Sequence, residues 1–202
     1  MPWAWSLLKR SNALKDRVPW IVYAARAHVR SRLHQEARVF EYGAGGSTLW
    51  FADLGCHVTS VEHDAAWHAL VNDRLTPLER SRVTCLLAPP QPLDEEGAPA
   101  ENLFRSGDDR LRGISFEKYV TAIDSQPDAS LDLVLVDGRA RSRCLVRAWP
   151  KVRPGGLLVL DDSDRDRYLS AMEQLPRSGR HDYFGPAAYS RWYWRTTVWE
   201  KT

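Results

Sequence analysis

One stretch of this sequence has the residue types and spacing that a nucleotide-like ligand requires. In VFEYGAGGSTLWF, residues 39–51, an apolar segment leads into clustered glycines and then into two hydroxyl side chains. Gly43 and Gly45 can adopt backbone conformations that other residues reach only at a cost in energy. Ser47 or Thr48 can cap a helix that follows. A strand, a glycine turn and a helix N-terminus together form the general pattern of a cofactor-binding loop.

Carboxylates follow two later apolar segments at the points where we expect strands to end. Asp137 ends DLVLVDG, and Asp161 and Asp162 end RPGGLLVLDD. Ligands of open parallel sheets bind beyond the carboxyl ends of the strands. A carboxylate placed there could take a proton from an oxygen nucleophile. We therefore predict Asp137 and Asp161 as catalytic residues.

The glycine pattern distinguishes two classes of cofactor. A dinucleotide fingerprint, GxGxxG, would require a third glycine at the position of Thr48. Glu62, at the end of the next predicted strand, could accept hydrogen bonds from ribose hydroxyls in either class. Glu41 stands two residues before Gly43, where it would oppose a phosphate but would tolerate a cationic ligand. It could equally bind backbone amides of its own loop.

The elements that must position these residues alternate between strand and helix. Apolar positions at helical spacing predict a helix over 18–36, and a short helix is expected over 49–54. Apolar runs such as DLVLVDG suit buried parallel strands. HDYFGP and YWRTTVWEK predict an antiparallel hairpin at the sheet edge, joined by the Gly-Pro dipeptide. The fold class is thus α/β, with a helical segment at 1–35 packed on a domain at 36–202, and residues 88–114 forming a long loop.

Bulk properties favour an ordinary cytoplasmic protein. The chain has 202 residues, 44% of them hydrophobic, and a formal net charge of +2. This charge does not suggest a nucleic-acid partner, and no run of residues is apolar enough to span a membrane. The three cysteines are too far apart for a zinc or disulfide framework. Trp3 and Trp5 make a homodimer an expectation to test.

Four ordered motifs, VFEYGAGGSTLW, VTSVEHD, LVLVDGRARSRC and VRPGGLLVLDDSDR, resemble the class I S-adenosylmethionine-dependent methyltransferases. Within that superfamily the chain resembles a bacterial group whose first motif reads E-Y-G-x-G-x-S-T. The resemblance covers about residues 36–170 and implies a Rossmann-like, doubly wound sheet of seven strands with the last strand antiparallel. It also implies which residues bind S-adenosyl-L-methionine: Glu41, Gly43, Ala44, Gly45, Ser47 and Thr48 in the loop, Glu62 at the ribose, His63 and Ala88 beside the adenosine, and Asp137 beside the transferring methyl.

The same layout is similar to the metal-dependent catechol-type O-methyltransferases, which carry an acid after the fourth strand and an Asp-Asn pair after the fifth. Through that resemblance Asp137, Asp161 and Asp162 could hold Mg²⁺. The lysine base of that family has no match, because position 140 is Ala140. Asp161 and Asp162 could instead cap a turn and a helix. We predict no metal site and keep the triplet as the alternative.

We therefore expect a methyltransferase that acts on a small molecule, at an oxygen atom. The alternatives are an NAD-dependent oxidoreductase and a non-catalytic cofactor-binding module with the same fold. Arginines at alternate positions after Asp137 could clamp an anionic acceptor, or could lie on the exposed side of a helix: Arg139, Arg141 and Arg143.

Overall fold

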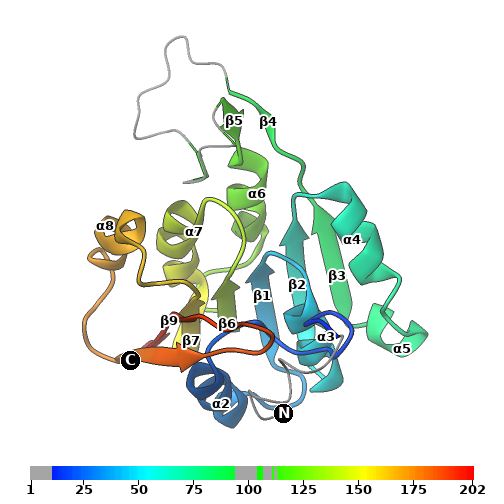
Figure 1. Cartoon of the computed structure of the whole chain (residues 1–202), viewed down its shortest axis with the longest axis horizontal. Helices are drawn as coiled ribbons and strands as arrows, with labels where there is room; N and C mark the ends of the chain where they lie inside the picture. Colours follow the sequence, from blue (N-terminus) through cyan, green and yellow to red (C-terminus); the bar gives the residue numbers. More distant parts are fainter. Residues whose placement is uncertain (1–10, 94–103, 107–110, 112) are drawn as a thin grey trace.

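The structure is a computed structural model that describes residues 11–93, 104–106, 111 and 113–202. Within this part of the chain, seven strands form one sheet and two short strands form a separate pair (Figure 1). The strands of the large sheet are β1 (Arg38–Tyr42), β2 (His57–Glu62), β3 (Val83–Leu87), β6 (Leu131–Val136), β7 (Val152–Leu160), β8 (Arg180–Pro186) and β9 (Tyr193–Glu200). The short pair is β4 (Gln91–Pro92) with β5 (Ile114–Ser115).

Helices connect most of these strands. The α-helices are α2 (Tyr23–Arg32), α3 (Gly46–Asp53), α4 (Ala65–Asn72), α5 (Pro77–Arg80), α6 (Glu117–Thr121), α7 (Arg141–Ala148) and α8 (Leu169–Met172). Three short 3₁₀ helices cover Ala122–Ser125, Trp149–Lys151 and Asp166–Tyr168. None of the helices in the described part of the chain is long and apolar enough to cross a membrane.

The strand order in the large sheet is β3-β2-β1-β6-β7-β9-β8. The pairs among β3, β2, β1, β6 and β7 are parallel, whereas β9 runs antiparallel to both β7 and β8. The predicted doubly wound α/β sheet with an antiparallel C-terminal hairpin is confirmed. The chain reverses its direction of winding between β1 and β6, and such a switch point is where open α/β sheets bind ligands.

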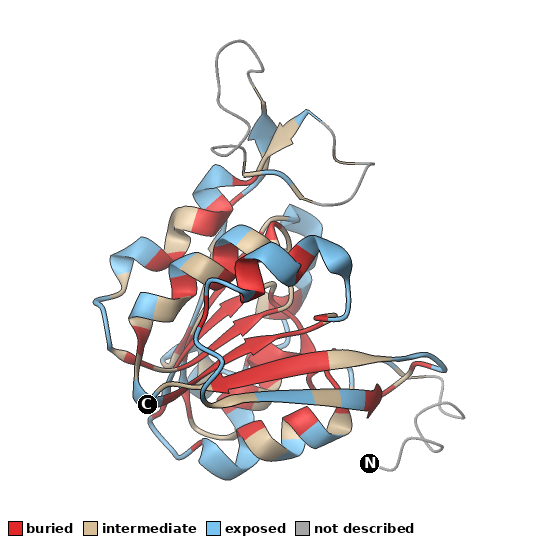
Figure 2. Cartoon of the chain, turned by 90° about the vertical axis from the view of Figure 1, so that its left-hand side faces the viewer, coloured by how far each residue is buried: buried red, intermediate tan, exposed pale blue. Residues whose placement is uncertain are grey.

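Both faces of the sheet are buried, as Figure 2 shows. Neighbouring residues of β6 point to opposite faces: Leu133 and Leu135 belong to one core cluster, Val134 and Val136 to the other. The first cluster lies under α2 and α3, and the second lies under α6, α7 and α8. A strand buried on both sides has to be apolar at every position, which explains the LVLV run.

The N-terminal helix begins later than the sequence predicts. Helicity spans Tyr23–Arg32 rather than 18–36, and Val22 instead forms an isolated antiparallel bridge with Ala187. Pro19 precedes this point and restricts the residue before it. Residues of this segment, including Leu14 and Val29, belong to the same core cluster as α3. We propose that the segment is part of one domain with the sheet.

Other boundaries also differ. Gly185 and Pro186 lie inside β8, so the hairpin turns through residues 187–192 instead of through the Gly-Pro dipeptide. Helix α3 begins at Gly46, three residues before the predicted start. Most of the predicted loop at 88–114, together with Trp3 and Trp5, lies outside the described residues.

Candidate functional site

A cavity of about 720 Å³ lies at the switch point between β1 and β6. Its wall combines the glycine loop, the residues after β2, β6 and β7, the segment before α2, and the turn of the β8–β9 hairpin. The residues that line it are Asn12, Ala13, Leu14, Trp20, Gly43, Ala44, Gly45, Gly46, Ser47, Glu62, His63, Asp64, Trp67, Asp137, Gly138, Arg139, Arg141, Asp162, Arg165 and Tyr189. Seven of the predicted site residues are therefore brought together here: Gly43, Ala44, Gly45, Ser47, Glu62, His63 and Asp137.

The glycine loop is shaped by two close backbone approaches. Gly43 has φ +97°, and a Cβ atom on it would lie 2.9 Å from the Cα of Gly138. The loops that follow β1 and β6 are thus in contact. Position 43 requires glycine both because of its positive φ and because a side chain would collide with Gly138. A Cβ atom on Gly46 would lie 2.3 Å from the carbonyl oxygen of Ala13, so the N-terminal segment packs directly on the start of α3.

Gly45 differs from its neighbours. A Cβ atom on Gly45 would meet nothing within 4 Å, and its backbone is extended, with φ 174°. Because Gly45 also lines the cavity, the missing side chain leaves open space for a ligand close to the backbone.

Glu41 and Thr48 lie beneath the glycine loop and not in the cavity wall. The Thr48 hydroxyl accepts a hydrogen bond from the backbone N–H of Gly45 at 2.9 Å and donates to Glu41 at 2.5 Å. Ser60 of β2 also donates to the same carboxylate oxygen, at 2.6 Å. Glu41 is fully buried, and burial raises its pKa to about 7. In the described structure, Glu41 fixes the loop through Thr48.

Glu62 lines the cavity, and its carboxylate is oriented by backbone amides. One oxygen accepts from His63 and Asp64, at 2.7 and 2.8 Å, and the other accepts from Ala44 at 3.2 Å. The last bond ties the end of β2 to the glycine loop. Ala88 donates its backbone N–H to the carbonyl oxygen of Glu62 at 2.7 Å, but Ala88 is buried and does not line the cavity.

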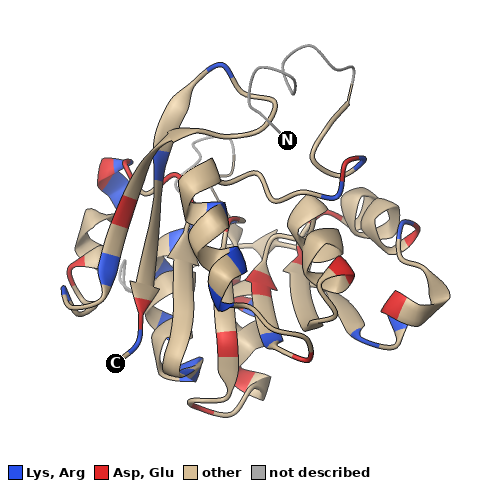
Figure 3. Ribbon diagram, turned by 90° about the horizontal axis from the view of Figure 1, so that it is seen from below, with Lys and Arg blue, Asp and Glu red and all other residues tan. Residues whose placement is uncertain are grey.

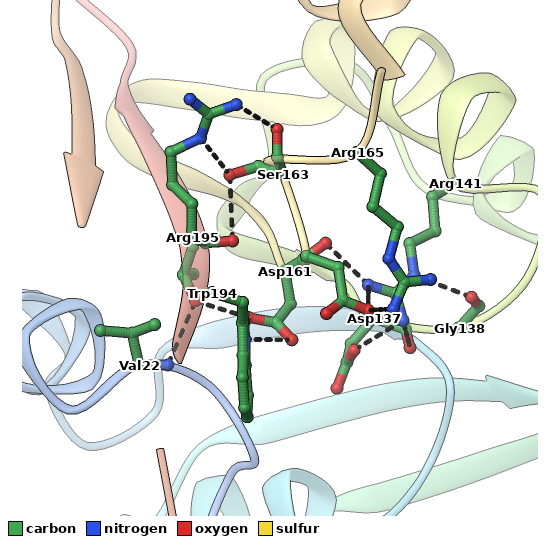
Figure 4. Close-up of polar contacts among 11 residues, drawn as sticks. Val22, Asp137, Gly138, Arg141, Asp161, Ser163, Arg165, Trp194 and Arg195 are labelled. Atoms are coloured by element: carbon green, nitrogen blue, oxygen red, sulfur yellow. Dashed lines mark hydrogen bonds and ion pairs between the residues drawn. The ribbon is translucent and has the colours of Figure 1, made fainter. Parts of the chain in front are cut away.

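A largely buried guanidinium lies beside Asp137, the acid that follows β6 (Figure 4). Arg141 donates to the carbonyl oxygens of Gly138 and Asp161 at 2.9 and 2.7 Å, and its side chain is only 11% exposed. Its Nη2 also lies 3.0 Å from the carboxylate of Asp137. Burial raises the pKa of Asp137 to about 7, although Arg141 opposes this shift and Asp162 adds to it.

Asp161 turns away from the cavity. Its carboxylate accepts hydrogen bonds from Trp194 Nε1 at 2.9 Å and from the Thr196 hydroxyl at 2.5 Å, both on β9. Burial raises the pKa of Asp161 well above its ordinary value. Its predicted catalytic role therefore receives no support from its position, because β9 covers the carboxylate.

The donor set does not fit the alternative of a metal held by the three acids. Asp162 pairs with two cations, Arg141 at 3.2 Å and Arg165 at 2.6 Å, while Asp161 faces β9. The positive charge among these acids is thus supplied by guanidinium groups. Within the described residues, no group of three or more His, Cys, Asp or Glu side chains is placed to hold a metal ion.

Several cavity residues were not predicted as site residues: Asn12, Trp20, Trp67, Arg165 and Tyr189. Trp67 donates its indole N–H to the carbonyl oxygen of Ala44 at 2.7 Å, and so holds the loop from the side of α4. In the sequence, the only indication that Trp67 reaches the site is its position in the helix that follows Glu62. Arg165 ends the motif VRPGGLLVLDDSDR, which assigned it no role in the site. Asn12, Trp20 and Tyr189 come from segments without a motif, and only the folded chain brings them to the cavity.

Fold and cavity together define a Rossmann-like α/β protein with a cavity at the switch point of a seven-stranded sheet. No family model and no curated protein matches the chain. Among solved structures, a methyltransferase-like protein from Silicibacter pomeroyi is 25% identical, with 89% of this chain and 87% of that chain covered and a TM-score of 0.54.

Two further structures have the same fold. A precorrin-6y C5,15-methyltransferase from Geobacter metallireducens is 18% identical over 88% of this chain and 87% of its own, with a TM-score of 0.54. A Burkholderia thailandensis 1,6-didemethyltoxoflavin-N1-methyltransferase, solved with S-adenosylhomocysteine, is 16% identical over 89% of this chain and 77% of its own, with a TM-score of 0.51. The resemblance to the class I S-adenosylmethionine-dependent methyltransferases is confirmed at the level of fold.

Proposed function

We propose that this protein is an S-adenosylmethionine-dependent methyltransferase that acts at an oxygen atom of a small molecule. The observation that carries the proposal is the cavity at the switch point, which is lined both by Glu62 at the end of β2 and by Asp137 after β6. A carboxylate after the second strand suits ribose hydroxyls, and an acid after the fourth parallel strand along the chain suits the reacting end of the ligand.

The residues present fit this cofactor. Gly43 and Gly138 touch through backbone alone, and Gly45 leaves open space where a side chain would otherwise stand. Glu62 is held toward the cavity by three backbone amides, so its geometry is set before a ligand arrives. The 1,6-didemethyltoxoflavin methyltransferase with the same fold was solved with S-adenosylhomocysteine bound, which supports the same cofactor class here.

The chemistry that the cofactor supplies is an electrophilic methyl group, whose bond to sulfur breaks, with the electron pair left on sulfur, as the bond to the acceptor oxygen forms. The acceptor loses its hydroxyl proton, and we assign this proton to the carboxylate of Asp137. Its pKa of about 7 suits proton transfer at neutral pH. Arg141, whose Nη2 lies 3.0 Å from this carboxylate, keeps it in place, and the cavity wall aligns the acceptor.

A small molecule fits the site better than a nucleic acid does. Figure 3 shows Lys and Arg interspersed with Asp and Glu along the same elements. The arginines of the cavity are also partly neutralised, because Arg141 and Arg165 pair with Asp137 and Asp162. A nucleic-acid site would instead be expected to carry a basic surface.

The proposal is tested by titrating S-adenosylhomocysteine into the wild-type protein and into a Glu62→Gln variant. We expect at least a tenfold loss of affinity in the variant, since a hydrogen bond to a charged group contributes about 1.5–3 kcal/mol. Glu36→Gln is the matched control, because Glu36 is exposed and pairs with His57 and Arg82 away from the cavity. Equal affinity in Glu62→Gln and wild type would contradict the role of Glu62.

A further inference from the structure

Besides Trp67 of α4, two aromatic side chains from outside the sheet line the cavity, Trp20 and Tyr189. Trp20 precedes α2, and Tyr189 belongs to the turn between β8 and β9. Trp20 is 50% exposed, although it belongs to a well-packed part of the chain. A large apolar side chain left half in water beside a cavity gains favourable burial when a ligand in that cavity covers it.

The Trp20 ring packs against a tryptophan of β9. Its ring centroid lies 6.5 Å from that of Trp194 in an edge-to-face arrangement. Trp194 is in turn anchored by its hydrogen bond to Asp161, the residue before Asp162 of the cavity wall (Figure 4). Trp20 therefore packs against β9 and lines the same cavity as Asp137 and Asp162.

The Tyr189 ring is fixed by a different contact. Its hydroxyl donates to the Asp16 carboxylate at 2.5 Å, which joins the hairpin turn to the N-terminal segment. The backbone of Tyr189 has φ +61°, in the left-handed region that a non-glycine residue adopts only when its surroundings hold it there. These contacts restrict both rings before a ligand binds, which lowers the conformational entropy lost when a ligand packs against them.

The charges of the cavity argue against an anionic acceptor held by arginines. Arg141 uses its donors on three backbone carbonyls and on two carboxylates, and Arg165 is paired with Asp162. Arg139 donates to His63 at 3.4 Å. The cavity that contains the Asp137 carboxylate also presents aromatic surface from Trp20 and Tyr189.

We propose that the methyl acceptor is a planar aromatic molecule bearing a hydroxyl group, which packs against Trp20 and Tyr189 and presents its hydroxyl to Asp137. This inference rests on the proposed function and names its substrate class. Aromatic surface discriminates such a ligand from a saturated one of the same shape, because ring-to-ring contacts contribute beyond the area that they bury.

The experiment compares two probes of nearly equal size, 2-naphthol and its saturated analogue decahydro-2-naphthol. Each is titrated calorimetrically into the wild-type protein in the presence of saturating S-adenosylhomocysteine. We expect 2-naphthol to bind about tenfold more tightly than the analogue, and Trp20→Leu to remove about that factor, which lies within the range for aromatic stacking. Trp192→Leu is the matched control. Trp192 lies in the same hairpin turn as Tyr189 and is 80% exposed, but it does not line the cavity.

S-adenosylhomocysteine affinity is measured for every variant, and its retention in Trp20→Leu shows that the cavity is still folded. Equal binding of the two probes, binding of neither, or an unchanged 2-naphthol affinity in Trp20→Leu would overturn the aromatic acceptor while leaving the proposed cofactor intact. Failure of the wild-type protein to bind S-adenosylhomocysteine would overturn the proposed function itself, and this inference with it.

Discussion

Arg141 contacts Asp137 at two points: its Nη2 donates to the carbonyl oxygen at 2.9 Å and lies 3.0 Å from the carboxylate. The guanidinium therefore fixes both the end of β6 and the side chain that we place beside the acceptor. Because Arg141 stands at the first position of α7, one residue positions the acid and joins the strand to the helix that covers it.

Arg141→Met should destabilise the protein by up to about 3–5 kcal/mol, the effect of removing one partner of a fully buried ion pair, since Arg141 is 11% and Asp137 24% exposed. The backbone carbonyls that Arg141 serves would also lose their donor. Urea unfolding measures the change. Arg147→Met is the control, because its pair with Asp124 is roughly 40% exposed on both sides and should contribute at most about 1 kcal/mol. Equal losses in the two variants would show that Arg141 has no special role.

Methyl transfer should depend on pH through Asp137. The pKa of this carboxyl is raised to about 7, so below that pH the group carries a proton and cannot accept another. The rate should rise with pH and level off above about 7. Asp137→Asn should reduce transfer by about 10²-fold or more while binding S-adenosylhomocysteine as the wild type does. A variant that retains full activity, or a wild-type rate that is flat across this range, would remove Asp137 from the mechanism.

Two adjacent glycines should respond differently to alanine. Gly45→Ala should fold normally, since its Cβ meets nothing within 4 Å, but the added methyl should lower the affinity for S-adenosylhomocysteine by about tenfold. Gly46→Ala should lower the unfolding midpoint, because its Cβ would lie 2.3 Å from the carbonyl oxygen of Ala13. Thermal unfolding and calorimetric titration of both variants check the contrast. Unchanged affinity for S-adenosylhomocysteine in Gly45→Ala would mean that the ligand does not approach Gly45.

Glu41 should make the protein less stable as pH rises. Its pKa is about 7 in the folded protein, raised by burial from an ordinary 4.5, so the folded state binds a proton that the unfolded state has released between these values. The contribution is present below about pH 4.5 and is lost as pH rises to about 7, amounting to about 3 kcal/mol. Comparing urea unfolding of wild type and Glu41→Gln across this range isolates it. Parallel stability curves would contradict the raised pKa.

The sequence predicts those parts of the site that depend only on residues close together in the chain. The glycine turn and the apolar strand before Asp137 follow from residues close in sequence, and both lie where the motifs predict. Glu41 and Thr48 belong to the same motif, yet they support the loop from below, because Ser60 of the neighbouring strand completes their contacts. That pairing depends on strand register, which the motif does not specify.

Contacts between distant segments could not be predicted. Asp161 follows its strand as expected, but hydrogen bonds from Trp194 and Thr196 on β9 turn its carboxylate away from the cavity. Arg141 was open to being an anion clamp or an exposed helix residue. The left-handed backbone of Ala140, with φ +47°, precedes it at the junction of strand end and helix. Neither the orientation of Asp161 nor the contacts of Arg141 can be predicted from residue type or periodicity.

The central claim is the cofactor class, and calorimetric titration of the wild-type protein with S-adenosylhomocysteine, with NAD⁺ in parallel, tests it most directly. We expect binding of S-adenosylhomocysteine in the micromolar range. We expect no binding of NAD⁺, because the loop lacks the third glycine that would pack beneath the pyrophosphate. Selective binding of NAD⁺ would contradict the account in favour of an oxidoreductase, and binding of neither would leave a fold without the proposed activity.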